Sequence, residues 1–226
     1  MVVANRMPVR RVQKGKPGEW ETSPGGLVTA LSPMLTERGG GWVGWDGSTN
    51  RRPTPPFTHS NIKIRPIGMS GSEFESFYAG FSNKTLWPLY HDSIREPHFH
   101  RRWWWPYLQV NERFAEATCE VARAGDMIWV HDYQLQLVPG LVRERLPKSR
   151  IGFFLHIPFP PEELFAKIPW RQQILEGMLG ADVIGFQTIL AARNFSRATR
   201  RFTDATGSDK KLKFQGRTIA IDAFPI

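Results

Sequence analysis

Residues 127–165, MIWVHDYQLQLVPGLVRERLPKSRIGFFLHIPFPPEELF, have the pattern of a strand, a helix and a strand in about the length of one βαβ unit. The runs 127–130 and 151–155 are continuously apolar, which is typical of strands buried on both faces of a parallel sheet. Each run ends at a histidine, His131 in the first and His156 in the second. Ligands of open α/β sheets bind beyond the carboxyl ends of the strands. The stretch therefore predicts an α/β fold with a mostly parallel sheet flanked by helices, and a site at its carboxyl edge.

The rest of the chain continues this alternation of strands and helices. Apolar runs predict strands at 2–5, 42–45, 62–67 and 182–186, and a closing hairpin over 212–223. Helical spacing predicts helices over 23–37, 106–124, 169–179 and 190–202. We see no linker that divides residues 1–226, so a single domain is expected.

Two segments before the central unit have weaker signals. Residues 8–20 are polar and contain glycine, which indicates a loop. Ser72 and Glu75 have the spacing of a capping box, which predicts a short helix carrying Phe74, Phe77 and Tyr78.

Composition narrows the setting and the partner. No apolar run approaches the ~20 residues that span a bilayer, and residues 1–4 lack the pattern of a signal peptide. Cys119 is the single cysteine, so we expect a reducing, cytoplasmic location without membrane contact. The net charge of +9 calls for an anionic partner. Because the basic residues are scattered, we expect a small phosphorylated ligand and no nucleic acid.

Two features are candidates for binding that phosphate. Gly25 and Gly26 stand at an expected helix start, where free backbone N–H groups accept anions, although two glycines also make a plain turn. Arg6 follows the first expected strand and points toward the same edge as His131 and Asp132. Its guanidinium could bind a phosphate bidentately, or it could form a surface salt bridge.

His131, Asp132 and His156 are open to three interpretations: metal ligands, a general acid/base set, or groups that recognise sugar hydroxyls. A metal is the weakest of these, because the adjacent His131 and Asp132 would project to opposite sides of a strand. The nine tryptophans favour a sugar, since indole faces stack on sugar rings. Residues 103–105, three tryptophans in a row, could instead form an exposed patch.

Taken together, the ordered motifs resemble the amino-terminal half of the trehalose-6-phosphate synthase family. The matching segments cover nearly the whole chain: ANR (4–6), SPGGL (23–27), GWVGW (41–45), FSN (81–83), LWP (86–88), WVHDY (129–133), FFLHIPFP (153–160) and GFQT (185–188). Each is weak alone, and the ordered set is specific.

The resemblance implies one half of a GT-B glycosyltransferase, in which two Rossmann-like domains face a cleft. Such an enzyme moves glucose from a nucleotide sugar, with UDP-glucose expected, to glucose 6-phosphate with retention. By position, the residues that match the acceptor site are Arg6, Trp42, Tyr78, Trp87 and Asp132. The resemblance implies no cofactor and no metal.

The remaining family positions concern the donor and the anomer. Asp132 and His156 are the expected catalytic pair, with His156 facing the donor sugar. Gly25 and Gly26 match the loop that meets the donor diphosphate. Trp87 and Ile157 lie where the family is thought to select the anomer.

Other readings remain open at this point. The resemblance stops at 224–226, where the family continues into a nucleotide-sugar domain, so we expect residues 1–226 alone to be inactive or nearly so. The acceptor could be another phosphate, as in a glucosylglycerol-phosphate synthase or a cyclitol-joining relative. A noncatalytic sugar-phosphate-binding module would use the same pocket, and a homo-oligomer is compatible with either.

Overall fold

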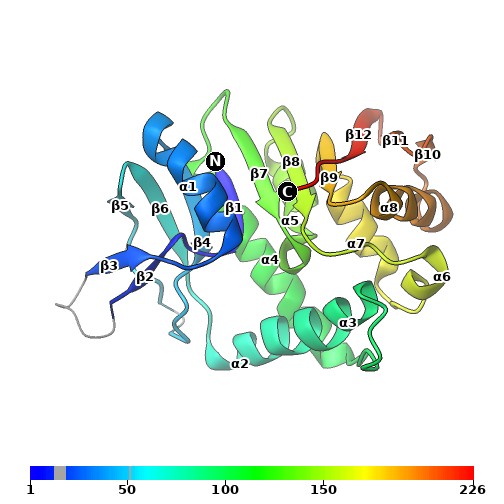
Figure 1. Ribbon diagram of the computed structural model, residues 1–226, viewed down its shortest axis with the longest axis horizontal. Helices are drawn as coiled ribbons and strands as arrows, with labels where there is room; N and C mark the ends of the chain where they lie inside the picture. Colours follow the sequence, from blue (N-terminus) through cyan, green and yellow to red (C-terminus); the bar gives the residue numbers. More distant parts are fainter. Residues whose placement is uncertain (13–18, 51) are drawn as a thin grey trace.

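The computed structural model describes residues 1–12, 19–50 and 52–226, and its centre is a ten-stranded sheet flanked by helices (Figure 1). The strands of this sheet are β1 (Val2–Arg6), β4 (Gly40–Trp45), β5 (Phe57–His59), β6 (Ile62–Ile67), β7 (Met127–His131), β8 (Arg150–Leu155), β9 (Val183–Phe186), β10 (Thr206–Gly207), β11 (Lys211–Phe214) and β12 (Arg217–Ala223).

The strand order is β10-β11-β12-β9-β8-β7-β1-β4-β6-β5. All neighbours from β12 to β6 are parallel, and the strands beyond them at both edges pair antiparallel. This confirms the expected α/β class with a mostly parallel sheet. From β1 the chain moves to β4 and β6, then returns to the other side of β1 at β7. The carboxyl ends of β1 and β7 therefore flank a topological switch point, where such sheets bind ligands.

Helices cover both faces of the sheet. They are α1 (Gly26–Arg38), α2 (Gly71–Glu73), the π-helix η1 (Phe74–Leu86), α3 (Trp87–Tyr90), α4 (Arg101–Val121), the 3₁₀ turn η2 (Tyr133–Leu135), α5 (Val138–Arg145), α6 (Glu162–Phe165), α7 (Arg171–Met178) and α8 (Ile189–Phe202). Within β1, Val2 packs with α1 in one hydrophobic cluster and Val3 packs with α4 in another. Alternate residues of a strand point to opposite faces, so this strand is buried on both sides.

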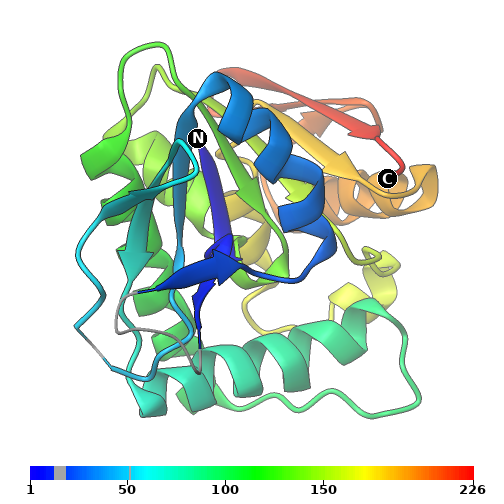
Figure 2. The same cartoon turned by 60° about the vertical axis from the view of Figure 1, so that its left-hand side comes forward.

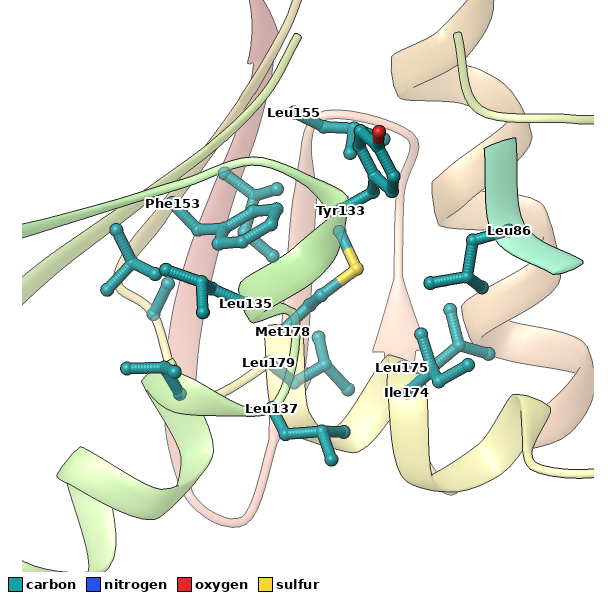
Figure 3. Packing of buried hydrophobic residues seen from close by; sticks show 14 of the residues in the cluster. Leu86, Tyr133, Leu135, Leu137, Phe153, Leu155, Ile174, Leu175, Met178 and Leu179 are labelled. Carbon is teal, nitrogen blue, oxygen red and sulfur yellow. The ribbon is translucent and has the colours of Figure 1, made fainter. Parts of the chain in front are cut away.

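The segment after β7 is anchored in the larger of the two clusters. Figure 3 shows Leu135 of η2 and Leu137 just after it among Met178 and Leu179, with Phe153 of β8 close by. Leu135, Met178 and Leu179 are fully buried. This packing fixes the backbone that immediately follows Asp132.

A long helix lies across the carboxyl ends of the central strands, as Figure 2 shows below β1. It runs through α2, η1 and α3, so it is longer than the short helix predicted around Phe74. The capping box was also misplaced: the Ser70 side chain accepts from Glu73 N, and the Glu73 carboxylate accepts from Ser70 N. Glu73 takes this position in place of Glu75 because Arg113 of α4 donates to the Glu73 carboxylate at 2.6 Å.

Two further expectations are corrected. The predicted loop 8–20 contains strand β2 (Val9–Arg11) and the first residue of its partner β3 (Trp20–Thr22), and its residues 13–18 lie outside the described part. Helix α4 begins at Arg101, earlier than predicted, and takes in the tryptophan run. Trp103 is buried and Trp104 stacks on Trp170 with ring centroids 5.1 Å apart, so only Trp105 is exposed, at 60%. The run therefore forms no exposed patch.

Candidate active site

Arg6 ends β1 at the switch point with its guanidinium lying on an aromatic ring. Its Cζ lies 4.0 Å from the ring centroid of Trp45 and 5.9 Å from that of Tyr78. The parallel register pairs Arg6 with Trp45, which explains the first contact. Among the described residues no carboxylate forms an ion pair with Arg6. The salt-bridge interpretation of Arg6 is thus wrong for the described part of the chain.

Trp42 lies behind Arg6 and not in front of it. It is 1% exposed, and its indole N–H donates to the carbonyl oxygen of Arg6 at 2.9 Å. The expectation that Trp42 lines the pocket is therefore corrected: its side chain belongs to the core and supports the backbone of Arg6. Trp45 was not in the predicted site, yet it is the indole that meets the guanidinium.

Two hollows open around Arg6. A cavity of about 740 Å³ runs along the β2–β3 hairpin, and its lining includes Arg6, Arg10, Arg11 and Arg52. A smaller one, of about 230 Å³, connects Arg6 with Ser23 and Pro24 just before α1. The guanidinium groups make the larger cavity suited to an anion, although Arg10 is already paired with Glu21 at 2.8 Å.

The ends of β7 and β8 bring a carboxyl group and two imidazoles together. Asp132 Oδ1 accepts from the backbone N of His156 at 3.2 Å, and His131 Nδ1 lies 3.1 Å from His156 Nε2. The pairing of β1 with β7 ends at Val3 and Val130. The pairing therefore stops before Arg6 and His131, the last residues of the two strands.

Burial sets the charge state of these groups. It raises the pKa of Asp132 to about 6, even though two backbone N–H groups favour its ionised form. Burial lowers the pKa of His131 to about 3, helped by the neighbouring His156, and that of His156 to about 4. Near pH 7 the site therefore holds one carboxylate and two neutral imidazoles, a set that suits hydroxyl recognition.

Asp132 also has an unusual backbone conformation, with φ at 75°. Left-handed residues other than glycine cost of order 1–3 kcal/mol and persist where their surroundings hold them. Two backbone hydrogen bonds do so here: Asp132 N donates to Phe154 O at 2.8 Å, and Leu135 N donates to Asp132 O at 3.0 Å.

A buried polar network fixes the turn after Asp132. The Tyr107 hydroxyl donates to Tyr133 O at 2.8 Å, and Asn111 donates to Gln134 O at 3.0 Å. Gln136 Nε2 also donates to Tyr133 O, at 3.1 Å. Tyr107, Asn111 and Gln136 are fully buried, so each of these bonds is protected from water.

Replacing Tyr107 by phenylalanine is expected to lower the free energy of unfolding by about 1–2 kcal/mol, because a buried bond to Tyr133 O is lost. Urea unfolding of the two proteins measures the difference. The control is Phe77→Leu, which removes ring contacts with Tyr107 but no hydrogen bond. An unchanged midpoint for Tyr107→Phe would show that the network does not stabilise the turn.

The same turn is tied to the long helix. The Tyr133 hydroxyl donates to Asn83 Oδ1 at 2.8 Å, one turn before Trp87 on that helix. Trp87 is 41% exposed and stacks on His91 with centroids 4.1 Å apart. Tyr78 and Trp87 thus share one long helix that is hydrogen-bonded to Tyr133, the neighbour of Asp132, but no described contact joins Trp87 to Arg6.

The remaining predicted residues are placed as follows. Gly25 caps α1 with φ at 153°, and Gly26 begins the helix. A Cβ at either glycine would meet nothing within 4 Å, so the helix start is open to a ligand. Ile157 is partly buried against the larger core cluster. No described contact joins these three residues to Arg6.

Besides Trp45, the sequence did not indicate Tyr133 and Asn83 as residues of a site. Both stand in motifs used for the resemblance, but nothing in their spacing predicts that they meet. In the described ranges no group of three or more His, Cys, Asp or Glu residues could hold a metal ion. Nor does any helix there have the length and apolar character needed to cross a membrane.

The sequence pattern of glycosyltransferase family 20 matches residues 1–226. The chain belongs to glycosyltransferase family 20. A trehalose-6-phosphate synthase from Mycobacterium avium (strain 104) is 46% identical over 240 residues, covering 100% of this chain and 49% of the relative. The resemblance to the trehalose-6-phosphate synthase family is thereby confirmed.

Solved structures of family 20 members share the fold. An α,α-trehalose-phosphate synthase from Burkholderia xenovorans, in complex with glucose-6-phosphate, has a TM-score of 0.83 at 31% identity, covering all of this chain and 50% of that one. An E. coli structure bound with UDP-2-fluoro glucose has a TM-score of 0.84 at 32% identity, covering 100% of this chain and 48% of that one. The chain thus spans about half the length of the relatives it matches.

Proposed function

We propose that this chain is the acceptor-binding half of an α,α-trehalose-6-phosphate synthase, which transfers glucose from a nucleotide sugar to glucose 6-phosphate with retention. The observation that carries the proposal is the Arg6 guanidinium. It lies over Trp45 and near Tyr78 and forms no ion pair in the described part of the chain, although the Asp46 carboxylate is near enough to favour its charged form. Such a group is available to bind a phosphate bidentately. The Burkholderia relative in complex with glucose-6-phosphate supports this acceptor.

The other groups take roles that follow from their places. Asp132, ionised near pH 7, accepts hydrogen bonds from acceptor hydroxyls, and His156 faces the donor sugar. The open start of α1 at Gly25 and Gly26 meets the donor diphosphate through backbone N–H groups. The E. coli relative bound with UDP-2-fluoro glucose supports a uridine nucleotide as the donor.

Two further roles complete the proposal. Trp87 and Ile157 take part in selecting the anomer. Because the chain spans about half the length of its relatives, we propose that turnover also requires groups from the other half of the family's length. These would stabilise the departing diphosphate.

The acceptor pocket is tested by calorimetry with glucose 6-phosphate at millimolar concentration. Arg6→Ala is expected to weaken binding by about tenfold or more, because a charged hydrogen-bonding partner of the phosphate is lost. Arg123→Ala is the matched control. It removes the same charge at the exposed end of α4, before β7, at the opposite edge of the sheet.

Equal affinity of the wild type and Arg6→Ala would show that the phosphate does not bind at Arg6. A parallel titration with glycerol 3-phosphate tests the acceptor itself. If glycerol 3-phosphate binds more tightly, it becomes the better candidate for the acceptor, and Arg6 remains the proposed phosphate site.

A further inference from the structure

His131 holds an imidazole that is closed off from solvent. The residue is 1% exposed, and its Nε2 atom is buried without a hydrogen-bond partner among the described residues. The ring lies between that of Trp129, 4.7 Å away, and that of His156, 5.3 Å away. Its second nitrogen, Nδ1, lies 3.1 Å from His156 Nε2. Only one nitrogen of His131 therefore has a partner.

This asymmetry decides where the proton of His131 sits. A neutral imidazole has one N–H donor and one nitrogen with a lone pair. Buried N–H groups without a partner are rarer in proteins than buried acceptors without one. The proton is therefore on Nδ1, which has His156 Nε2 as an acceptor. An imidazolium is excluded for the same reason, because it would place an N–H and a charge at the enclosed Nε2.

The proton on His131 in turn determines that of His156. Because His156 Nε2 accepts the hydrogen bond, it carries a lone pair, and the proton of neutral His156 must be on Nδ1. Burial keeps His156 neutral near pH 7, with a pKa of about 4. His156 Nδ1 has no partner among the described residues and is not one of the enclosed atoms. It is free to meet a ligand.

We infer that His131 is a positioning residue that fixes the tautomer of His156, so that His156 presents an Nδ1–H donor to the oxygen of a sugar hydroxyl. The adjacent Asp132 carboxylate accepts hydrogen bonds, so this edge of the sheet offers one donor and one acceptor to the hydroxyls of a sugar. The tautomer rests on geometry alone. The sugar as its ligand rests on the proposed function.

The tautomers are read directly from the chain labelled with ¹⁵N-histidine, by long-range proton–nitrogen NMR at neutral pH. His131 and His156 are both expected in the Nδ1–H form. Finding the proton of either ring on Nε2, or a rapidly exchanging mixture at His156, would overturn the inference.

Two variants separate positioning from packing. In His131→Asn the side-chain amide keeps a donor close to the place of Nδ1, so His156 is expected to stay in the Nδ1–H form. In His131→Leu the donor is lost, and the proton of His156 is expected to move largely to Nε2. The same tautomer in both variants would show that His131 only fills space. If His131→Leu does not fold, the wild-type and His131→Asn spectra still decide.

A titration with UDP-glucose keeps this inference distinct from the proposed function. Binding is expected to shift the Nδ1–H resonance of His156 more than those of the exposed His98 and His100. If UDP-glucose binds and that resonance does not move, His156 does not present its donor to the sugar. If the wild type shows the expected tautomers but binds neither glucose 6-phosphate nor UDP-glucose, the proposed function fails and the tautomer assignment stands.

Discussion

Replacing Gly180 by alanine is expected to lower the free energy of unfolding by about 3 kcal/mol or more, a large effect for one methyl group. A Cβ at this position would lie 2.3 Å from both Gly140 N and Pro139 C, and 2.4 Å from Gly140 Cα. These are backbone atoms of α5, so no side chain can rotate away to make room. The turn after α7 would have to separate from α5.

The effect should reach the site as well as the fold. Helix α5 follows η2, and η2 follows Asp132 directly. Gly177 of α7 is similarly close to the backbone just before α5, since a Cβ there would lie 2.7 Å from Gln136 O. Moving α5 away from α7 therefore pulls on the network that fixes the turn after Asp132. Under the proposed function, weaker glucose 6-phosphate binding is expected to accompany the loss of stability.

Urea unfolding with a matched glycine variant tests this contact. Gly71→Ala is the control, because a Cβ there meets nothing within 4 Å and its φ is not in the left-handed region. Within helix α2 the added methyl should be neutral or stabilising by about 0.5–1 kcal/mol. Similar midpoints for Gly180→Ala and Gly71→Ala would mean that the close approach of α5 and α7 contributes nothing to stability.

The sequence predicted the central strands, and the edge where we propose the site, for a physical reason. Strands buried on both faces are apolar at every position, so β7 and β8 stand out and their ends at His131 and His156 are clear. Parallel strands bring their carboxyl ends to one edge. Arg6, Asp132 and His156 could therefore be placed together before any contact was known.

The errors arose where local patterns are degenerate. Ser70 with Glu73 and Ser72 with Glu75 both fit a capping box, and only the contact of Arg113 with Glu73 selects the first. Strands of three residues such as β2, β3 and β5 are too short to show a period. The sequence also did not indicate the close packing of η1 on α4, as at Gly80, where a Cβ would lie 2.7 Å from the Trp103 ring.

The exchange of Trp42 for Trp45 at Arg6 has a similar cause. Two strand residues three positions apart point to opposite faces, so one of these indoles had to be turned away from the other. The sequence does not say which face of β4 carries the site. The pairing of Arg6 with Trp45 across β1 and β4 settles it. The role of His131 was equally hidden, because it depends on which ring nitrogen is enclosed.

The buried histidines should make the fold sensitive to acid. When folding keeps a histidine neutral, only the unfolded state binds the extra proton at pH values between 6.5 and the folded pKa. The free energy of unfolding therefore decreases as pH falls through that range. His131 and His156 have folded pKa values of about 3 and about 4. Asp132, with a folded pKa of about 6, acts in the opposite direction, since the folded state takes up its proton first. The two histidines outweigh the one carboxyl group.

With one histidine removed, the pH dependence from the remaining histidine should be largely offset by that from Asp132. Between about pH 7 and about pH 5, the wild type is expected to lose about 2 kcal/mol of stability relative to His131→Asn, because asparagine has no proton to gain. Denaturant unfolding of both proteins at several pH values measures the change in this difference. Any constant offset from the lost ring cancels, because only the dependence on pH is compared.

His98→Asn is the control for this experiment. His98 is exposed and lies outside the buried pair, so the same substitution there measures the effect of losing an imidazole elsewhere on the chain. If the stability difference between wild type and His131→Asn did not change with pH, folding would not keep His131 neutral. The enclosed Nε2 of His131 would then carry a proton in the folded state. The hydrogen bond to His156 would no longer place the single proton of His131 on Nδ1. A difference that grows toward low pH only for His131→Asn supports a neutral pair at the end of β7 and β8.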